Sequence, residues 1–224
     1  MAVNFGAPAP LDGGQFPHRP PRMTLLVNHP QLQEIRERLR QNIVLRRLKP
    51  RAFSELESVL HIMDYRKGDM LLSQGAHEME QYFVIDGILK RVVASPEGKE
   101  MILRFAKEDD MDTSYAAWKL RTPAPYSIRC VTKARVAKMP LPQWASFLDA
   151  HPDLKDDFEY EVMFLMGEVM AHTITLHLLD APGRVHRFMR KHPELSERVP
   201  KKELASYLNL SAETLSRLKH AGKI

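Results

Sequence analysis

Three residues near the carboxyl end of the chain have side chains suited to reading a nucleic acid: Glu213, Ser216 and Arg217. At helical spacing they share one side of a short helix, where they offer a carboxylate, a hydroxyl and a guanidinium. Such groups hydrogen-bond the edges of base pairs in a DNA major groove. A plain helical hairpin with a solvated polar face would show the same pattern, and the sequence leaves that alternative open.

A helix-turn-helix over 200–218 would position these side chains. Asn209 tolerates the left-handed conformation that ends a helix, and Ser211 is a good amino-terminal cap for the next one. A turn this short joins two helices at a steep angle. Five apolar residues mark their inner faces: Leu204, Ala205, Leu208, Leu215 and Leu218.

Charge and composition limit the other possibilities. The formal net charge of the 224 residues is +5, and residues 182–224 hold ten Lys or Arg against four Glu, a surplus that suits a polyanion but also an ordinary solvated surface. Cys130 is the only cysteine, which excludes an intrachain disulfide and a Cys-ligated iron–sulfur cluster. No apolar run reaches membrane-spanning length, so we expect a soluble, cytoplasmic protein with no membrane partner.

The amino-terminal half divides into three stretches. Residues 1–30 hold six of the 16 prolines and predict a flexible tail, part of which could dock; its His18, Arg19 and Arg22 could contact DNA or heme, or simply be solvated. Residues 31–60 have helical apolar spacing. From 62 to about 139, short β-type runs between turn residues predict a sandwich or β-roll, with strands at 70–72, 82–85, 88–93, 101–105, 126–131 and 135–139.

A short helix is expected over 142–150, and a long one from Pro152 to about Leu179, with two apolar stripes. A helix that is apolar on two sides needs two partners, so one stripe is expected to meet the same helix of a second subunit; burial within a monomer is the alternative. The expected homodimer stripe is Phe158, Val162, Leu165, Val169, His172, Leu176 and Leu179. The stripe expected to face the β-roll is Leu154, Met163, Met166, Met170 and Ile174.

The sequence Asp180-Ala181-Pro182-Gly183 is expected to break the long helix and to act as a hinge. One more helix follows, marked by Val185, Phe188 and Met189 and ended by His192-Pro193. Replacing Pro182 and Gly183 with alanine is therefore expected to fuse the two helices.

This order of elements resembles the CRP/FNR family of bacterial transcription regulators. The resemblance covers roughly 45–218 and rests on the turn and strand at 65–75, the strand and tight turn at 82–87, and the strand at 98–103. It implies an α+β fold: a β-roll like that of cyclic nucleotide-binding domains, a long dimerisation helix and a carboxyl-terminal helix-turn-helix domain. The implied division is tail 1–30, sensor 31–150, dimerisation helix 151–180 and DNA-binding domain 181–224.

The chain departs from the family where cyclic-nucleotide-binding members hold the ribose and phosphate. Thr113 and Ser114 stand where those members have a glycine-glutamate pair, and Ala124-Pro125 stand where they have an arginine-serine pair. With Asp109, Asp110 and Asp112 nearby, a cyclic phosphate would meet carboxylates and no fixed cation. Binding of cyclic AMP by the usual mode is therefore not expected, although Arg121 and Arg129 could still favour an anion.

Another effector is expected to occupy a pocket walled by Ile85, Leu103, Phe105, Thr113, Ser114 and Tyr126 and closed by residues near Met166 and Met170. No cofactor or metal is expected. Heme is an alternative, because His77 follows Gly75 at a place where one heme-sensing branch has a ligand, but no partner ligand is evident. The three aspartates could hold a divalent cation, although an acidic turn explains them as well, and no enzyme activity is expected.

The resemblance also implies half-sites of the TTGAT type in an inverted repeat of double-stranded DNA. Arg217 would pair with guanine, Glu213 would accept from a cytosine amino group, and Ser216 would add a weaker contact. Lys201, Lys202, Ser211 and Lys219 would contact phosphates. The chain stops at Ile224 without the β-hairpin wing that many members have, so we expect lower and more salt-sensitive affinity.

The sequence therefore favours a homodimeric transcription regulator that contacts RNA polymerase. A different class remains as the alternative: a sensory β-roll that acts through protein contacts, or binds heme or another small ligand, and whose DNA-binding unit is vestigial. Salt-sensitive binding to a palindrome separates the two.

Overall fold

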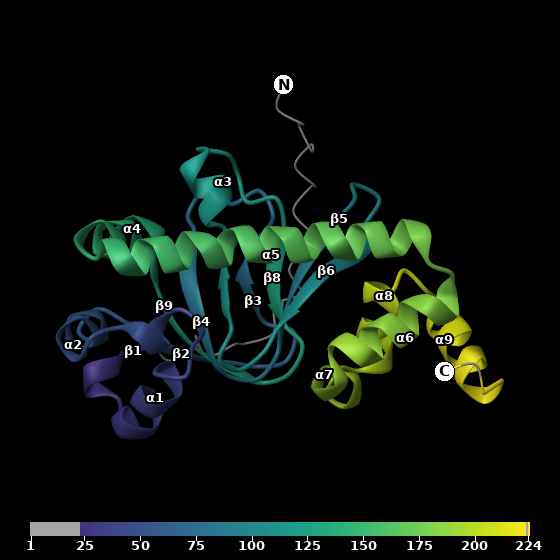
Figure 1. The fold of residues 1–224 in the computed structure, drawn as a ribbon, viewed down its shortest axis with the longest axis horizontal. Helices are drawn as coiled ribbons and strands as arrows, with labels where there is room; N and C mark the ends of the chain where they lie inside the picture. The colour runs from purple at the N-terminus through teal and green to yellow at the C-terminus, as the bar shows by residue number, and fades with distance from the viewer. Residues whose placement is uncertain (1–22, 223) are drawn as a thin grey trace, which may run out of the picture.

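The computed structural model describes residues 23–222 and Ile224. In this part of the chain nine strands form two antiparallel sheets, one long helix crosses them, and a group of short helices follows (Figure 1). His18, Arg19 and Arg22, considered above for contact with DNA or heme, lie outside the described residues.

The first sheet has five strands in the order β1-β2-β9-β4-β7. Their bounds are Met23–Leu25, His61–Tyr65, Ala134–Pro140, Glu80–Asp86 and Met111–Thr113. β1 lies within the segment expected to be a tail: Met23 pairs with Met63, and the adjoining Leu26 is fully buried. The sequence left open that part of this segment docks, but it could not indicate which part, because a three-residue strand gains its stability from a neighbour that proline content does not reveal.

The second sheet has four strands in the order β3-β8-β5-β6. Their bounds are Met70–Leu72, Ser127–Cys130, Leu89–Ala94 and Glu100–Ala106. The six expected strand segments all contain strands, so the β-roll prediction is confirmed. Strands β1, β2 and β7 were not individually expected; β7 has only three residues and interrupts an acidic segment.

Short helices cover one end of the β-roll. Pro50 opens α2, where its missing N–H costs nothing. α3 was not expected, because its five residues leave too little sequence for a helical period to show. The helices before the long one are η1 (Leu26–Asn28), α1 (Leu32–Leu39), η2 (Leu45–Arg47), α2 (Pro50–Glu57), α3 (Tyr115–Lys119) and α4 (Leu141–Ala150).

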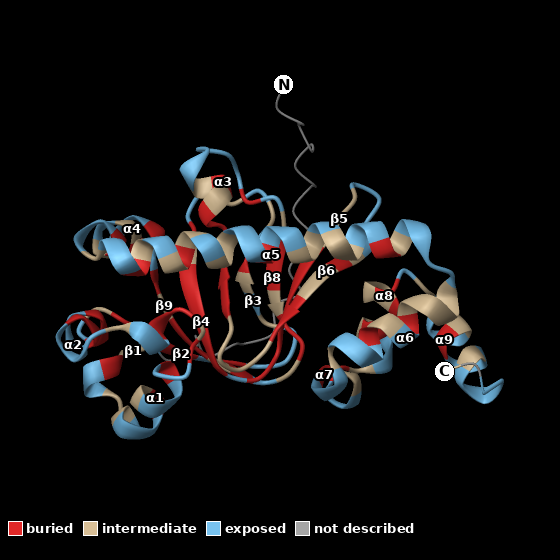
Figure 2. Cartoon of the chain, in the orientation of Figure 1, coloured by how far each residue is buried: buried red, intermediate tan, exposed pale blue. Residues whose placement is uncertain are grey.

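The long helix α5 spans Pro152–Leu178 and is exposed along one side (Figure 2). Apart from Leu154, which is buried as expected, its two apolar stripes face the opposite way from the prediction. Phe158 is fully buried against the sensor's own core and Leu165 is 7% exposed, whereas Met163 and Met170 are 65% and 66% exposed. Of the predicted homodimer stripe, only Leu179 is among the exposed large hydrophobic residues. Periodicity finds both faces of such a helix but does not say which partner each one meets.

Four helices complete the chain: α6 (Ala181–Lys191), α7 (Pro193–Arg198), α8 (Lys201–Tyr207) and α9 (Ala212–His220). The break after α5 consists of Leu179 and Asp180, which are both extended. Pro182 and Gly183 lie in the first turn of α6, and the Asp180 side chain accepts a hydrogen bond from the Gly183 N–H. The expected hinge is thus shifted toward the amino terminus, because a proline in a first turn starts a helix rather than ending one.

Candidate DNA-reading helix and sensor interior

The turn between α8 and α9 has the conformation that the sequence predicts. Asn209 has a φ of 52°, and the Ser211 Oγ accepts a hydrogen bond from the Thr214 N–H at 3.0 Å. Leu204, Leu208 and Leu215 are buried together on the inner side of the hairpin. The buried side is therefore fixed, and the opposite side of α9 is left to solvent.

Glu213, Ser216 and Arg217 all lie on that exposed side of α9. In the part of the chain that the structure describes, neither Glu213 nor Arg217 forms an ion pair, so a carboxylate and a guanidinium are both free to bind. Lys201, Lys202 and Lys219 are exposed as well. Ser211 differs from them, because its hydroxyl already caps α9 and also contacts the Thr214 hydroxyl at 3.0 Å.

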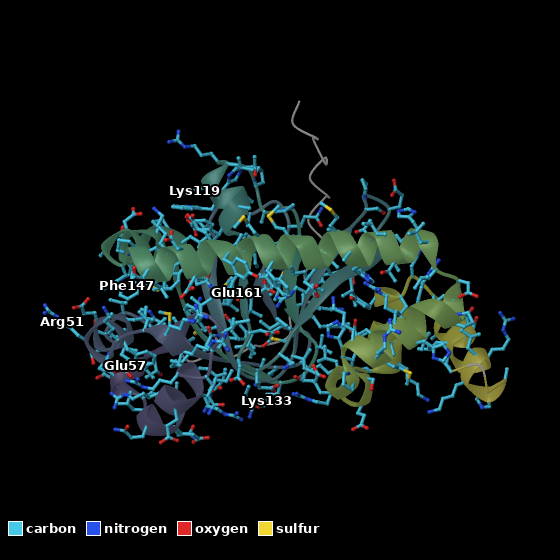
Figure 3. All side chains as sticks on the ribbon, in the orientation of Figure 1. Arg51, Glu57, Lys119, Lys133, Phe147 and Glu161 are labelled. Carbon is cyan, nitrogen blue, oxygen red and sulfur yellow. The ribbon has the colours of Figure 1, made fainter. Side chains whose placement is uncertain are left out.

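Not every cation of this basic chain belongs to the same surface. Arg51 of α2 and Lys119 of α3 lie toward the other end of the molecule from α9 (Figures 1 and 3). Arg51 is paired with Glu55 at 3.3 Å within its own helix. A duplex lying along α9 would therefore meet the lysines of α8 and α9 and not these two residues.

The carboxyl-terminal helices α6 to α9 share a hydrophobic cluster with the second sheet. Ile88, Ile102, Phe105 and Val131 of the sensor are buried in it with Phe188 of α6, among others. The ring centroid of Phe105 lies 5.2 Å from that of Tyr207 and 6.5 Å from that of Phe188. Phe105, expected in the wall of an effector pocket inside the β-roll, instead holds the two parts of the chain together.

Ion pairs surround this cluster. The Lys90 Nζ lies 2.7 Å from the Glu203 carboxylate, and both side chains are largely buried. Arg198 donates to both carboxylate oxygens of Glu108, at 2.6 and 2.8 Å. Burial opposes ionisation of Glu108, but hydrogen bonds from Arg198 and from the Gly87 N–H prevail and lower its pKa to about 2. The pairs fix the orientation in which the helices dock on the sheet.

Two side chains connect α5 to the carboxyl-terminal helices. The His172 ring stacks on the Tyr207 ring with centroids 3.8 Å apart, and its Nε2 donates to the Tyr207 carbonyl at 3.0 Å. Arg184 donates to the Leu179 carbonyl at 2.9 Å and to the Leu208 carbonyl at 3.1 Å. His172 was expected in the subunit seam, and the structure places it in this internal contact instead.

The interior of the β-roll contains a buried ion pair. The Arg91 Nε lies 2.7 Å from the Asp112 carboxylate, and the Arg91 Nη2 donates to the Thr113 carbonyl at 3.1 Å. Burial opposes the charge on Arg91, but the Asp112 carboxylate outweighs it and raises the pKa of the guanidinium. The Arg91 Cζ also lies 4.6 Å from the ring centroid of Tyr126, whose hydroxyl donates to the Thr113 carbonyl at 2.7 Å.

The expectation that this region holds no fixed cation is therefore wrong. Arg91 is present, and Arg104 lies 3.6 Å from the second oxygen of Asp112, but the carboxylate neutralises what would otherwise attract a phosphate. Of the other two arginines considered, Arg129 pairs with Glu100 at 2.6 Å and Arg121 is exposed. The sequence did contain a signal, because two adjacent cations in one apolar strand, Lys90 and Arg91, must point to opposite faces.

The residues predicted to wall the effector pocket do not form one wall. Thr113 and Ser114 are buried beside the Arg91–Asp112 pair, and Ile85 lines a polar surface pocket with Asp64 and Arg135. Leu103 and Tyr126 line an open cavity of about 860 Å³. Leu103 and Phe105 line a smaller one of about 220 Å³ between the second sheet, α5 and α8. Met166 and Met170, expected to close the pocket, are exposed.

The side chains that could bind a metal ion or heme are exposed, buried or already paired. Among residues 23–222 and Ile224, no group of three or more His, Cys, Asp or Glu side chains could hold a metal ion. His77 is exposed in its turn, and Asp110 and Asp112 face arginines. Cys130 is buried, and burial raises the pKa of its thiol to about 12. No described helix is long and apolar enough to span a membrane.

Comparison with known proteins identifies the class of protein. The model of the cyclic nucleotide-binding domain matches residues 62–151, which include most of both sheets and α4. The cAMP-activated global transcriptional regulator CRP of Salmonella typhimurium strain LT2 is 21% identical over 183 residues, which cover 76% of this chain and 87% of that protein. The CRP of Pasteurella multocida is 19% identical over 168 residues, covering 70% and 80%.

Solved structures share the fold. The c-di-GMP-responsive global regulator CLP of Xanthomonas campestris has a TM-score of 0.66 at 15% identity, covering 78% of this chain and 92% of that one. FixK2 of Bradyrhizobium japonicum has a TM-score of 0.62 at 17% identity, covering 73% and 86%. The chain thus contains a cyclic nucleotide-binding domain at residues 62–151 and is similar over most of its length to transcription regulators of the CRP/FNR type.

Proposed function

We propose that this protein is a homodimeric regulator that reads an inverted repeat of double-stranded DNA through α9. The observation that carries the proposal is the unpaired, solvent-facing set of Glu213, Ser216 and Arg217 on a helix whose other side is buried. Arg217 would read guanine, Glu213 a cytosine amino group, and the lysines at 201, 202 and 219 would bind phosphates.

The dimer would form through the exposed side of α5. At Gly167, near the middle of that side, no atom lies within 4 Å of where a Cβ would stand, so a second helix could approach closely. An apolar strip of this length on a monomer's surface is unusual. Its exposed residues are Tyr160, Met163, Phe164, Met166, Met170, Ile174 and Leu178.

Each part of the chain would then have its own role. Residues 31–150 would sense, residues 151–180 would dimerise, and residues 181–224 would bind DNA and present a surface to RNA polymerase. β1 adds residues 23–25 to the sensor. Cyclic AMP in the usual mode does not fit this proposal, because the Arg91–Asp112 pair and the Tyr126 ring occupy the polar interior of the β-roll.

Fluorescence anisotropy tests DNA reading. A labelled duplex with a TTGAT inverted repeat is compared with a scrambled duplex over a salt series. Wild type is expected to prefer the repeat, and Arg217→Ala to lose about 1–3 kcal/mol of that preference. Lys201→Ala is the matched control, expected to weaken binding to both duplexes equally and to reduce the salt dependence. Equal binding of wild type to both duplexes, with and without a small-molecule effector, would contradict the proposal.

Sedimentation equilibrium tests the dimer. Met163→Asp with Met170→Asp places carboxylates on the exposed side of α5 and is expected to yield a monomer. Glu161→Ala, on the half-buried side of the same helix, is the control and should leave the dimer intact. A monomeric wild-type protein at micromolar concentration would rule out this interface.

A further inference from the structure

The largest cavity described above lies between the sensor and the turn of the helix-turn-helix. Strands β5 and β6 and the segment at Pro125 form its walls, and Asn209 of the α8–α9 turn lines it from the other side. Its volume of about 860 Å³ is in the range of sites that hold small organic molecules. A molecule bound here would contact both parts of the chain at once.

The walls of this cavity are mainly apolar. Val93 and Met101 come from the paired strands β5 and β6, where they are directly opposite each other. Leu103, Pro125 and Tyr126 continue the apolar surface. Behind Tyr126 lies the Arg91 guanidinium, which is already satisfied by Asp112 and by the Thr113 carbonyl. The interior charges are therefore not available to a ligand, and the walls favour an apolar body.

The polar groups of the cavity fall into two sets. Gln74 is bonded in both directions to the Ala94 backbone, at 3.0 and 3.4 Å, and Glu100 is paired with Arg129 at 2.6 Å. The Lys99 ammonium and the Asn209 side-chain amide have no side-chain partner within the described part of the chain. The unused groups are thus one cation and one amide donor, which suit an anionic oxygen acceptor.

We infer that this cavity binds an amphipathic organic acid. Its aliphatic or aromatic body lies against Val93, Met101, Leu103, Pro125 and Tyr126, and its carboxylate lies at the rim toward Lys99 and Asn209. The site lies outside the buried Arg91–Asp112 pair and uses neither residue. The inference rests on the proposed function only where it concerns DNA affinity. Binding of the organic acid itself can be tested without DNA.

The position of Asn209 gives the ligand a route to the DNA-reading helix. Asn209 is the residue at which the chain reverses between α8 and α9, in a left-handed conformation with φ 52°. A ligand that holds its side chain against β5 and β6 restricts the turn and hence the direction of α9. Binding would shift DNA affinity because the ligand contacts one arrangement of the two parts and not another.

Isothermal titration calorimetry of the full-length protein with decanoate, and separately with decanol, tests the inference. Decanoate is expected to bind with a dissociation constant on the order of 10 µM, and decanol about fivefold more weakly because the rim cation is exposed. Lys99→Ala should remove the difference between the two probes. Leu103→Trp and Met101→Trp, two independent and uncharged obstructions of partly exposed positions, should each weaken decanoate binding by about tenfold or more.

Two control variants distinguish binding in this cavity from adhesion elsewhere on the protein. Met163→Gln alters the exposed apolar side of α5 and should leave decanoate binding unchanged. If it abolishes binding while Leu103→Trp and Met101→Trp do not, the probe adheres to α5 and the inference is wrong. Absence of heat with decanoate at two well-separated temperatures would also overturn it, because burial of an apolar body changes the heat capacity. Arg217→Ala should bind decanoate normally, so loss of DNA reading and loss of ligand binding are distinguishable.

Discussion

The β-roll sensor and the carboxyl-terminal helices α6 to α9 are built around different kinds of core. The sensor core lies between the two sheets and under α4 and α5, with Trp144 packed edge-on against both Phe83 and Phe158. The second cluster has twelve buried residues, of which Ile88, Ile102, Phe105 and Val131 belong to the sensor. The first core is closed by the β-roll together with α4 and α5, and the second is completed by residues of the sensor.

The two cores differ because the carboxyl-terminal segment is much shorter than the sensor. A segment of about 40 residues rarely buries enough apolar surface to fold alone. Here the outer face of the second sheet supplies what is missing, and the pairs Lys90–Glu203 and Glu108–Arg198 hold the two parts in register. The two parts of the chain are therefore joined through a shared interior as well as through α5.

Among the predicted changes, separating the two parts of the chain should have the largest effect on folding. A fragment of residues 181–224 is expected to be largely unfolded by circular dichroism, whereas a fragment of residues 1–180 should unfold cooperatively with urea. Addition of one fragment to the other should restore helical signal. A cooperative unfolding transition in the isolated fragment 181–224 would show that its core is self-sufficient. It would then contradict the difference between the two cores.

Trp144→Ala tests the self-contained core. Trp144 is fully buried, and its loss should lower the free energy of unfolding by ~4 kcal/mol. Urea denaturation followed by circular dichroism measures it. The whole chain should be affected, because the DNA-binding helices depend on the same sheets. Phe147→Leu, at a partly buried neighbour of Trp144, is the control and should cost much less.

Phe105→Ala tests the shared core. The free energy of unfolding should fall by ~3 kcal/mol, with earlier loss of the helices α6 to α9 than of the β-roll. Hydrogen exchange resolves the two regions. Val93→Ala, on the same sheet but outside the shared cluster, should affect both regions little. Uniform loss of protection in Phe105→Ala would mean that the two parts unfold as a single unit.

The smallest predicted effect is a pH dependence of folding stability that arises from His172. Burial lowers the pKa of His172 from 6.5 to about 4, against the opposing hydrogen bond to the Tyr207 carbonyl. The group is neutral in the folded state, so its contribution to stability is full above pH 6.5 and is lost as pH falls toward 4. Lys191, His192 and Arg187 also disfavour its charge. His172→Phe, which keeps an aromatic ring beside Tyr207, should flatten the stability profile in that window; an unchanged profile would contradict the assignment.

Sequence patterns predicted most of the elements and much less of their contacts. The cap at Ser211 and the left-handed Asn209 are local features, so residue type alone indicated them. The faces of α5 were exchanged, because Phe158 and Met163 carry the same apolar signal and only packing tells them apart. Arg91 and Asp112 pair across 21 residues of sequence. The pattern of the strand that holds Arg91 could have indicated a buried cation, but it could not have indicated which carboxylate pairs with it.

The Arg184 side chain has a consequence for how the break after α5 tolerates variation. Its guanidinium ties the carbonyl at the start of the break, that of Leu179, to the carbonyl at the end of α8, that of Leu208. Both acceptors belong to the backbone, so substitutions at positions 179 and 208 can keep the tie. The two hydrogen bonds therefore depend on one side chain, that of Arg184, whereas position 208 matters for the buried cluster to which Leu208 belongs.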